Sequence, residues 1–424
     1  MLLSASIGCN QQSGSVAKAS SNKTNPPQQQ VSGTAAQEKS AAPDKTAPDK
    51  TAPDKTASKQ TASDQQARES LNQIVGKGVA FLLEKGRDRE DGSYSKQLSP
   101  AVTALCISAL VRNGLPVGNK KIQQSLKWLE GHIKDDGGIY AVKSNLKNYE
   151  TSVALVAFHQ CNVDGKYDIQ IENATNFLKG IQWDEGEEYS EDHKFYGGQG
   201  YGKHERPDLS NTSYFMDSLA ELSDDTQSNS DAKRKAVIFI SRCQNLPSEH
   251  NSAEFAEVAS DDDRGGMIYS AVGKGETKAA ATADTPQGGL RSYASMTYAG
   301  LKSYLYAGLD KDDIRVKAAL DWISRHYDLD NNPGMGKQGL YYYYHVFART
   351  LHTLGQPTIT DSEGKAHQWR ADLIKKLAAF QKEDGSWINE ADRWYESDPN
   401  LVTAYSLLAL SYCRELPQDA ANSR

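Results

Sequence analysis

The sequence predicts an all-α fold, an α6/α6 toroid in which six helix pairs close into a double ring. A helix–turn–helix unit recurs six times between residues 67 and 415, with apolar residues at helical spacing in both helices. The second helix of each unit is nearly free of charge and rich in Ala, Leu and aromatic residues. Because helices with little polar surface belong inside, we expect these helices to form an inner ring, with the more charged first helices outside. An open stack of the same pairs is the structural alternative.

The clearest copy of the unit is Ala379-Phe-Gln-Lys-Glu-Asp-Gly-Ser-Trp387, followed by Thr403-Ala-Tyr-Ser-Leu-Leu-Ala-Leu410. It is typical of a helix end, a glycine turn with an aromatic residue, a polar loop and a second helix. The first helix of each copy carries one aromatic residue, and these are separated by 47, 49, 62, 83 and 58 residues, so the loops differ in length. They are Phe81, Trp128, Phe177, Phe239, Trp322 and Phe380. The second helices are expected to begin near Thr103, Thr151, Thr212, Thr297, Tyr341 and Thr403.

Both ends of the chain differ in composition from this repeat region. In residues 1–9, small residues precede Cys9 in Ser6-Ile-Gly-Cys9, which resembles a truncated bacterial lipoprotein signal with Cys9 as the lipidated residue. Residues 10–66 are a low-complexity linker in which Ala-Pro-Asp-Lys-Thr occurs three times, and we expect it to be disordered. Residues 416–424 are a C-terminal tail. This plan predicts an extracytoplasmic, lipid-anchored protein; the alternative is a cytoplasmic protein with a disordered N-terminus.

Composition excludes several classes of partner and cofactor. The net charge of −7 and the pI near 5.8 give no basic surface for nucleic acid. No run of 18 apolar residues exists, so no spanning helix is predicted and the membrane is reached only through the lipid anchor. The remaining cysteines form no Cys-x-x-Cys or Cys/His cluster, so we predict no metal, no cofactor and buried cysteines in the core: Cys106, Cys161, Cys243 and Cys413.

The turn motif carries a family resemblance. Gln381-Lys-Glu-Asp-Gly-Ser-Trp387 resembles the Gln-Trp repeat of squalene–hopene and oxidosqualene cyclases, and Asp91-Gly-Ser-Tyr94 and Asp136-Gly-Gly-Ile-Tyr140 resemble weaker copies. The helix-pair repeat is also similar to that of protein prenyltransferase β subunits. The resemblance covers roughly residues 70–415 and implies the toroid fold and a central cavity for an apolar, isoprenoid-like ligand.

The catalytic motifs of both families are incomplete in this chain. The acidic Asp-x-Asp-Asp-Thr-Ala motif of the cyclases matches Asp208-Leu-Ser-Asn-Thr-Ser213, in which Ser210 and Asn211 stand where acids are expected. Because neither a hydroxyl nor an amide can protonate an alkene, Asp208 is the one candidate in this motif for a catalytic acid. The zinc-binding Asp-x-Cys of the prenyltransferases is absent from the sequence. A second acidic triplet, Asp261-Asp-Asp263, is expected to be a solvated loop.

The best candidates for binding residues lie near the N-termini of the inner helices, where backbone N–H groups and helix dipoles favour anions or polar groups. Their aromatic rings could hold a polyprenyl chain, stabilise a cation or stack on sugar rings. Helix capping is the alternative role for Asp208, Asn211 and Asp398, and core packing for part of the tyrosine run. The substrate-binding candidates are Glu150, His204, Arg206, Asn211, Arg291, Tyr293, Tyr298, Tyr342, Tyr343, His345, Trp394 and Asp398; Tyr149, Tyr341, Tyr344 and Arg393 lie among them.

Three hypotheses for function follow. The first is a protein of the cyclase/prenyltransferase superfamily that takes an apolar isoprenoid, and the second is a non-catalytic binding or scaffold lipoprotein on the same fold. The third is a polysaccharide lyase or hydrolase with Tyr343 and His345 as base and acid. Whether the chain is an enzyme, and its oligomeric state, stay open.

Overall fold

A computed structural model describes residues 55–222 and 226–414. The prediction of an all-α protein is confirmed, because this part of the chain holds thirteen α-helices and one two-stranded hairpin. Six helices form an inner set: α2 (Pro100–Arg112), α4 (Lys147–Gln160), α6 (Leu209–Glu221), α9 (Ala294–Tyr306), α11 (Leu340–Leu354) and α13 (Pro399–Ser411). Six lie outside them: α1 (Lys55–Phe81), α3 (Lys120–Glu130), α5 (Asp168–Lys179), α7 (Gln227–Arg242), α10 (Ile314–Arg325) and α12 (Trp369–Phe380).

The remaining elements are short. A turn of π-helix at Leu82–Gly86 follows α1, and 3-10 turns lie at Val163–Gly165, Glu185–Glu187 and Arg393–Tyr395. Helix α8 (Glu254–Glu257) belongs to the long insertion before α9. Strands β1 (Ile359–Thr360) and β2 (Ala366–His367) pair antiparallel, with Ile359 opposite His367, between α11 and α12.

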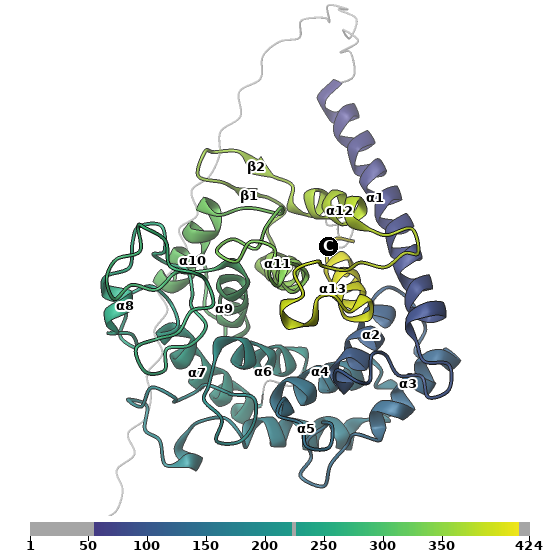
Figure 1. The fold of residues 1–424 in the computed structure, drawn as a ribbon, viewed down its shortest axis with the longest axis horizontal. Coiled ribbons are helices and arrows are strands. Elements are labelled where there is room, and N and C mark those ends of the chain that lie inside the picture. The colour runs from purple at the N-terminus through teal and green to yellow at the C-terminus, as the bar shows by residue number, and fades with distance from the viewer. Residues whose placement is uncertain (1–54, 223–225, 415–424) are drawn as a thin grey trace, which may run out of the picture. The chain divides into compact units, whose positions relative to one another are not determined.

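The inner helices form a closed ring. Each packs against the next in the order α2, α4, α6, α9, α11, α13, and α13 packs against α2. Figure 1 shows these six helices around a common centre, with α3, α5, α7 and α10 outside them. Helix α1 packs against α12 and α13, so the two ends of the repeat region meet. The inner helices are buried along most of their length, as their low charge predicts.

The Gln381–Trp387 motif joins the last helix pair to the first. The side-chain amide of Gln381 donates to the carbonyl of Ile74 in α1 at 2.9 Å and to that of Gly385 at 3.0 Å. Gly385 has a φ of +91°, and a Cβ there would lie 2.3 Å from the carbonyl oxygen of Lys77. The indole N–H of Trp387 donates to the Leu377 carbonyl at 2.8 Å. The motif is therefore a structural clamp that needs glycine for both its angle and its close approach.

The same clamp recurs in two earlier copies. Gln182 donates to the carbonyls of Gly197 and Ala232, and Gln244 donates to those of Gly265 and Arg315. A recurring hydrogen bond also ties the turns to the inner helices, because a threonine hydroxyl at five helix starts accepts the N–H of a turn residue. The pairs are Tyr94 with Thr103, Ile139 with Thr151, Gln199 with Thr212, Met267 with Thr297, and Trp387 with Thr403.

One boundary differs from expectation. Helix α1 begins at Lys55, inside the 10–66 stretch for which the sequence predicts disorder. Residues 55–66 follow Pro53, contain neither proline nor glycine, and carry Ala, Lys and Gln, which favour helix. The signal-like segment with Cys9, most of the linker and the tail 416–424 lie outside the described residues, so the lipid anchor stays a prediction.

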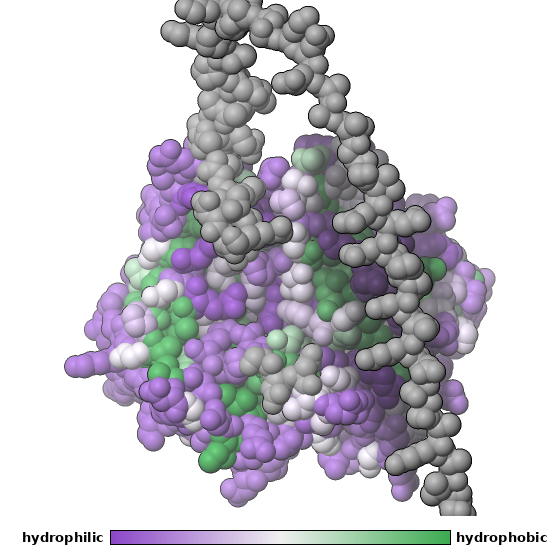
Figure 2. Space-filling view, turned by 180° about the vertical axis from the view of Figure 1, so that it is seen from behind, coloured by the Kyte–Doolittle hydropathy of each residue, from purple (hydrophilic) through white to green (hydrophobic). Residues whose placement is uncertain are grey.

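The four described cysteines are buried and unpaired, which agrees with the prediction that they belong to the core. No helix in residues 55–222 or 226–414 has the length and apolar character needed to cross a membrane. Where grey atoms do not cover it, the face seen in Figure 2 is mostly hydrophilic, with hydrophobic residues in separate groups.

Candidate functional site

A cavity of about 280 Å³ lies at the end of the ring where the inner helices begin. All six inner helices contribute to it through their first turns or through the residues just before them. It is lined by Leu98, Ser99, Val102, Leu146, Tyr149, Tyr201, Ser210, Asn211, Tyr214, Tyr269, Tyr293, Ser295, Met296, Gly339, Tyr342, Trp394, Tyr395, Glu396, Leu401 and Tyr405.

Aromatic rings dominate this lining, with eight tyrosines and one tryptophan. Three of the hydroxyl groups meet: the Tyr405 hydroxyl lies 3.4 Å from that of Tyr149 and 3.3 Å from that of Tyr214. The rings of Tyr149 and Tyr214 pack edge to face with centroids 4.7 Å apart. Burial raises the pKa of Tyr149 to about 12, so the phenol stays neutral. The wall is thus apolar ring surface with a cluster of hydrogen-bonding hydroxyls.

The segment before α13 brings Trp394 and Tyr395 to the cavity in a strained conformation. Both have a φ of +63°, in the left-handed region that non-glycine residues rarely adopt. Both side chains are partly exposed, 46% and 62% respectively. The Trp394 ring lies against Gly339, where a Cβ would approach it to 3.1 Å. Such strain persists only where the surroundings enforce it, and it is common at ligand sites.

Glu396 follows these two aromatics and is buried in the cavity wall. Its Oε1 accepts the N–H of Tyr341 at 3.0 Å and of Tyr342 at 2.8 Å, and its Oε2 accepts from the Asn389 amide at 2.7 Å. Burial raises its pKa to about 7, and these hydrogen bonds oppose the rise. Glu396 therefore fastens the Trp394–Tyr395 segment to the N-terminus of α11.

Asp208 lies just behind the wall and caps α6. Its Oδ1 accepts the N–H of Asn211 at 2.9 Å, and its Oδ2 accepts from the Asn211 side chain at 2.8 Å. Burial raises its pKa to about 6, which the hydrogen bonds from Asn211 and Tyr269 oppose. The Tyr269 hydroxyl also lies 3.2 Å from that of Tyr201. Asp208, the catalytic candidate, therefore does not line the cavity itself but contacts two residues that do, Tyr269 and Asn211.

The structure brings together some of the predicted binding residues and not others. Asn211, Tyr293, Tyr342 and Trp394 line the cavity. Glu150 does not line the cavity; it is buried behind the lining residue Ser99, whose hydroxyl donates to its carboxylate at 2.8 Å. Asp398 caps α13 by accepting the N–H of Leu401 at 2.9 Å. This is the helix-capping role given above as the alternative to ligand binding.

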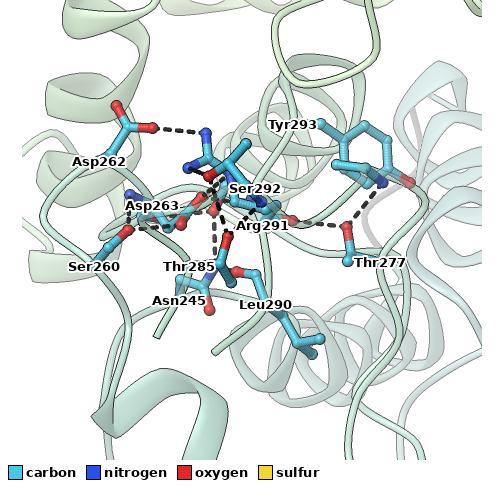
Figure 3. Close-up of polar contacts among 12 residues, drawn as sticks. Asn245, Ser260, Asp262, Asp263, Thr277, Thr285, Leu290, Arg291, Ser292 and Tyr293 are labelled. Atoms are coloured by element: carbon cyan, nitrogen blue, oxygen red, sulfur yellow. Dashed lines mark hydrogen bonds and ion pairs between the residues drawn. The ribbon is translucent and has the colours of Figure 1, made fainter. Parts of the chain in front are cut away.

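Three predicted residues on the loops lie elsewhere. His204 packs against the Trp183 ring with centroids 5.9 Å apart, and Arg206 pairs with Glu276. Arg291 turns away from the cavity, toward Asp262 at 2.7 Å and Asp263 at 3.3 Å (Figure 3).

The acidic triplet next to Arg291 is only partly the solvated loop that was expected. Asp261 and Asp262 are exposed, but Asp263 is buried and accepts the N–H of Ser292 at 2.8 Å. Figure 3 shows how Ser260, Asp263 and Arg291 converge around Ser292. The triplet organises the insertion before α9 because the buried carboxylate is paired on both sides.

Three predicted residues on α9 and α11 face other surroundings. Tyr298 is buried against Tyr343, with centroids 5.7 Å apart, and the Tyr343 hydroxyl donates to the Asp328 carbonyl at 2.7 Å. His345 lines a separate, smaller cavity of about 30 Å³ between the inner helices. Tyr343 lines neither of these two cavities, so the Tyr343–His345 base and acid pair does not share one space.

Among the aromatic and acidic lining residues, sequence reasoning missed six: Tyr201, Tyr214, Tyr269, Tyr395, Glu396 and Tyr405. Helical spacing offered a signal for two of them. Tyr405 follows Leu401 by four residues and Tyr214 follows Ser210 by four, so each tyrosine lies on the same helix face as a residue near the helix start. Glu396 had none, because its position depends on the two left-handed residues before it. Among the described residues, no group of three or more His, Cys, Asp or Glu side chains is placed to hold a metal ion.

Comparison with known proteins gives a likeness only at the level of solved structures. No family model and no curated protein matches the chain. A variant of the type II terpene cyclase MstE from Scytonema, in complex with geranylgeranyl dihydroxybenzoate, aligns at 13% identity and a TM-score of 0.49, covering 82% of this chain and 98% of the cyclase. An alpha-amylase from Clostridium perfringens aligns at 13% identity and a TM-score of 0.47, covering 79% and 96%.

A polysaccharide lyase aligns at 12% identity and a TM-score of 0.45, covering 85% of this chain and 99% of the lyase. At such identities and TM-scores, these likenesses say nothing about what the chain binds or catalyses.

Proposed function

We propose that the closed ring and its outer helices are the α6/α6 toroid expected from the sequence, and that its tyrosine-lined cavity binds a small molecule with an apolar, isoprenoid-like body. The observation that carries the proposal is the lining itself, in which nine aromatic rings surround a space of about 280 Å³. Small-molecule sites are concave and mainly apolar, with a few placed polar groups, and this cavity has that character.

The lining has both apolar surface and a cluster of polar groups, which suits a ligand with an apolar body and a polar end. Leu98, Val102, Leu146, Met296 and Leu401 add aliphatic surface to the rings. Each 100 Å² of apolar ligand surface removed from water contributes about 2.5 kcal/mol. The Tyr149, Tyr214 and Tyr405 hydroxyls offer hydrogen bonds to a polar end, because their mutual contacts of 3.3 to 3.4 Å are long.

Identification of co-purified ligands tests the proposal. The full chain is purified under native conditions, extracted into organic solvent and analysed by mass spectrometry, with Ser210→Trp as the control variant. Ser210 lines the cavity, and an indole there fills the space. We expect an isoprenoid or a similar apolar compound with the wild-type chain and none with the variant. A glycan, or the same compound at equal amount in the variant, contradicts the proposal.

A second candidate function is acid catalysis on the bound ligand. The observation in its favour is Asp208, a buried carboxyl group with a pKa near 6 that is hydrogen-bonded to the cavity residue Tyr269. A carboxyl group with a raised pKa is a suitable proton donor near neutral pH. Against it, Asn211 occupies both carboxylate oxygens, so we favour binding without chemistry.

We also propose that the chain is exported and anchored through a lipid on Cys9. The support is the Ser6-Ile-Gly-Cys9 segment and the low-complexity linker that follows it. Labelling of the expressed protein with radioactive palmitate tests this. We expect label in the wild-type chain and none in Cys9→Ser; an unlabelled wild-type chain contradicts the anchor.

A further inference from the structure

The one lining residue with a carboxyl or basic side chain is acidic. None of the residues that line the cavity is Lys, Arg or His, whereas Glu396 lies in the wall. Two more buried carboxyl groups stand directly behind: Asp208, hydrogen-bonded to Asn211, and Glu150, hydrogen-bonded to Ser99. Three acidic groups thus surround a largely apolar space that no cationic side chain enters.

Three basic residues beside the lining contact other partners. Arg206 and Lys278 both pair with Glu276, and the Lys278 ammonium lies 4.3 Å from the centroid of the Tyr269 ring. Arg393 stacks on Trp394 at 4.4 Å and donates to the side chain of Gln338. None of these three basic residues belongs to the lining of the cavity.

Four of the six inner-helix N-termini at this end are already bound by side chains of the protein, although the sequence suggested that they could bind anions. Asp208 accepts from α6, Asp398 from α13, and Glu396 from the first N–H groups of α11. Ser99 caps α2 in the same way. At α6, α11 and α13 a bound anion would therefore meet a carboxylate where it would otherwise meet the helix dipole.

The aromatic lining is suited to the opposite charge. The face of an aromatic ring is electronegative, and trimethylammonium groups bind in cages built from such faces. Eight phenols and an indole line the cavity, with Lys278 already over the Tyr269 ring and Arg393 over that of Trp394, and the phenol hydroxyls can point their oxygens at a cation. An alkylated ammonium also gives up little hydration, because its charge is spread over methyl groups.

We infer that the cavity takes an organic cation, a ligand that carries a quaternary or similarly alkylated ammonium group on an apolar body, and that it rejects anions such as carboxylates and diphosphates. This inference rests on the proposed function, because it assumes that the cavity is the ligand site. It goes further by specifying the charge of the ligand. The rings surround the cation, and Glu396, Asp208 and Glu150 supply the compensating negative field.

Three probes of nearly the same shape test the inference: choline, its neutral isostere 3,3-dimethylbutan-1-ol and the anionic 3,3-dimethylbutanoate. Binding to the full chain is measured by saturation-transfer NMR with Kd values from titration. We expect choline to bind about tenfold more tightly than the alcohol, and the carboxylate not to bind. Equal or tighter binding of the alcohol, binding of the carboxylate, or no binding of choline overturns the inference.

Two variants locate the effect. Glu396→Gln removes the charge in the wall and should reduce the preference for choline over the alcohol, whereas Glu390→Gln, an exposed control in the same segment, should not. Trp394→Leu removes an aromatic ring from the cavity and should also reduce the preference for choline. Because Trp394 is partly exposed, this substitution leaves the hydrophobic core intact. An unchanged preference in both cavity variants contradicts the inference. If the alcohol binds as well as choline and Ser210→Trp blocks both, the proposed apolar site stands and only the charge assignment falls.

Discussion

The side-chain amide of Gln381 lies 2.9 Å from the backbone carbonyl of Ile74 and joins the last helix pair to the first. The two residues are 307 positions apart, yet their contact repeats the one that Gln182 and Gln244 make to the next outer helix. A single local motif therefore links neighbouring pairs and also closes the ring.

Loss of this clamp should destabilise the whole repeat region. Gln381→Ala leaves the Ile74 and Gly385 carbonyls without their donor, and we expect the free energy of unfolding to fall by about 1–3 kcal/mol. Urea denaturation followed by circular dichroism measures it. Gln287→Ala, at an exposed loop position, is the control and should change stability little. Equal effects of the two substitutions would show that the clamp does not contribute.

The close approach at Gly385 can be separated from its backbone angle. Gly385→Ala places a methyl group 2.3 Å from the Lys77 carbonyl oxygen at a φ of +91°, whereas Gly364 has a similar φ of +82° and open space around it. We expect Gly385→Ala to cost about 1–3 kcal/mol more than Gly364→Ala, because only the first adds a clash to the backbone strain. Thermal unfolding of the two variants measures the difference, and equal losses would contradict the packing account.

The raised pKa of Glu396 predicts a pH dependence of stability. Its folded-state pKa of about 7 lies above the ordinary 4.5, so between these values the folded state binds more protons than the unfolded state. Stability should therefore fall as the pH rises from about 4.5 to 7, by an amount on the order of 1–3 kcal/mol from this group. Asp208, with a pKa near 6, acts in the same direction.

Glu396→Gln removes this contribution, so its unfolding free energy should change less between pH 5 and pH 8 than that of the wild-type chain. Denaturant titrations at several pH values provide the measurement, with Glu390→Gln as the exposed control. A pH profile of Glu396→Gln that parallels the wild type would show that Glu396 does not titrate in this range.

Asp208 can be tested for a catalytic role apart from its capping role. Asp208→Asn keeps a cap for α6, because an asparagine side chain also accepts the N–H of residue 211. We expect stability to change little, because the cap is kept. If the ligand found in the native protein is converted to a product, and the variant converts it at the wild-type rate, Asp208 is not the acid.

Much of the architecture could be predicted from the sequence because it is encoded locally. The glycine turns, the threonines at the inner-helix starts and the uncharged second helices each act within one repeat. The motif Gln381–Trp387 was recognised as a repeated turn for the same reason, and its hydrogen bonds show it to be a structural clamp.

The site was predicted less well, because its members come from all six pairs. Places at helix starts correctly predicted four lining residues: Tyr293, Tyr342, Asn211 and Trp394. Arg291 and Arg206 instead form ion pairs with acidic residues of the loops. Tyr298 and Tyr343 sit on helix faces that point into the core. Helical spacing cannot distinguish these faces in a run of four tyrosines, because every face carries one.

The most direct test of the central claim is a farnesol titration followed by intrinsic tryptophan fluorescence, to which Trp394 at the cavity contributes. The wild-type chain is compared with Ser210→Trp, which fills the cavity, and with Ser228→Trp, which adds the same indole on the exposed surface of α7. The account predicts saturable binding to the wild type and Ser228→Trp, and its loss in Ser210→Trp. Saturable binding of equal affinity to all three proteins would contradict it.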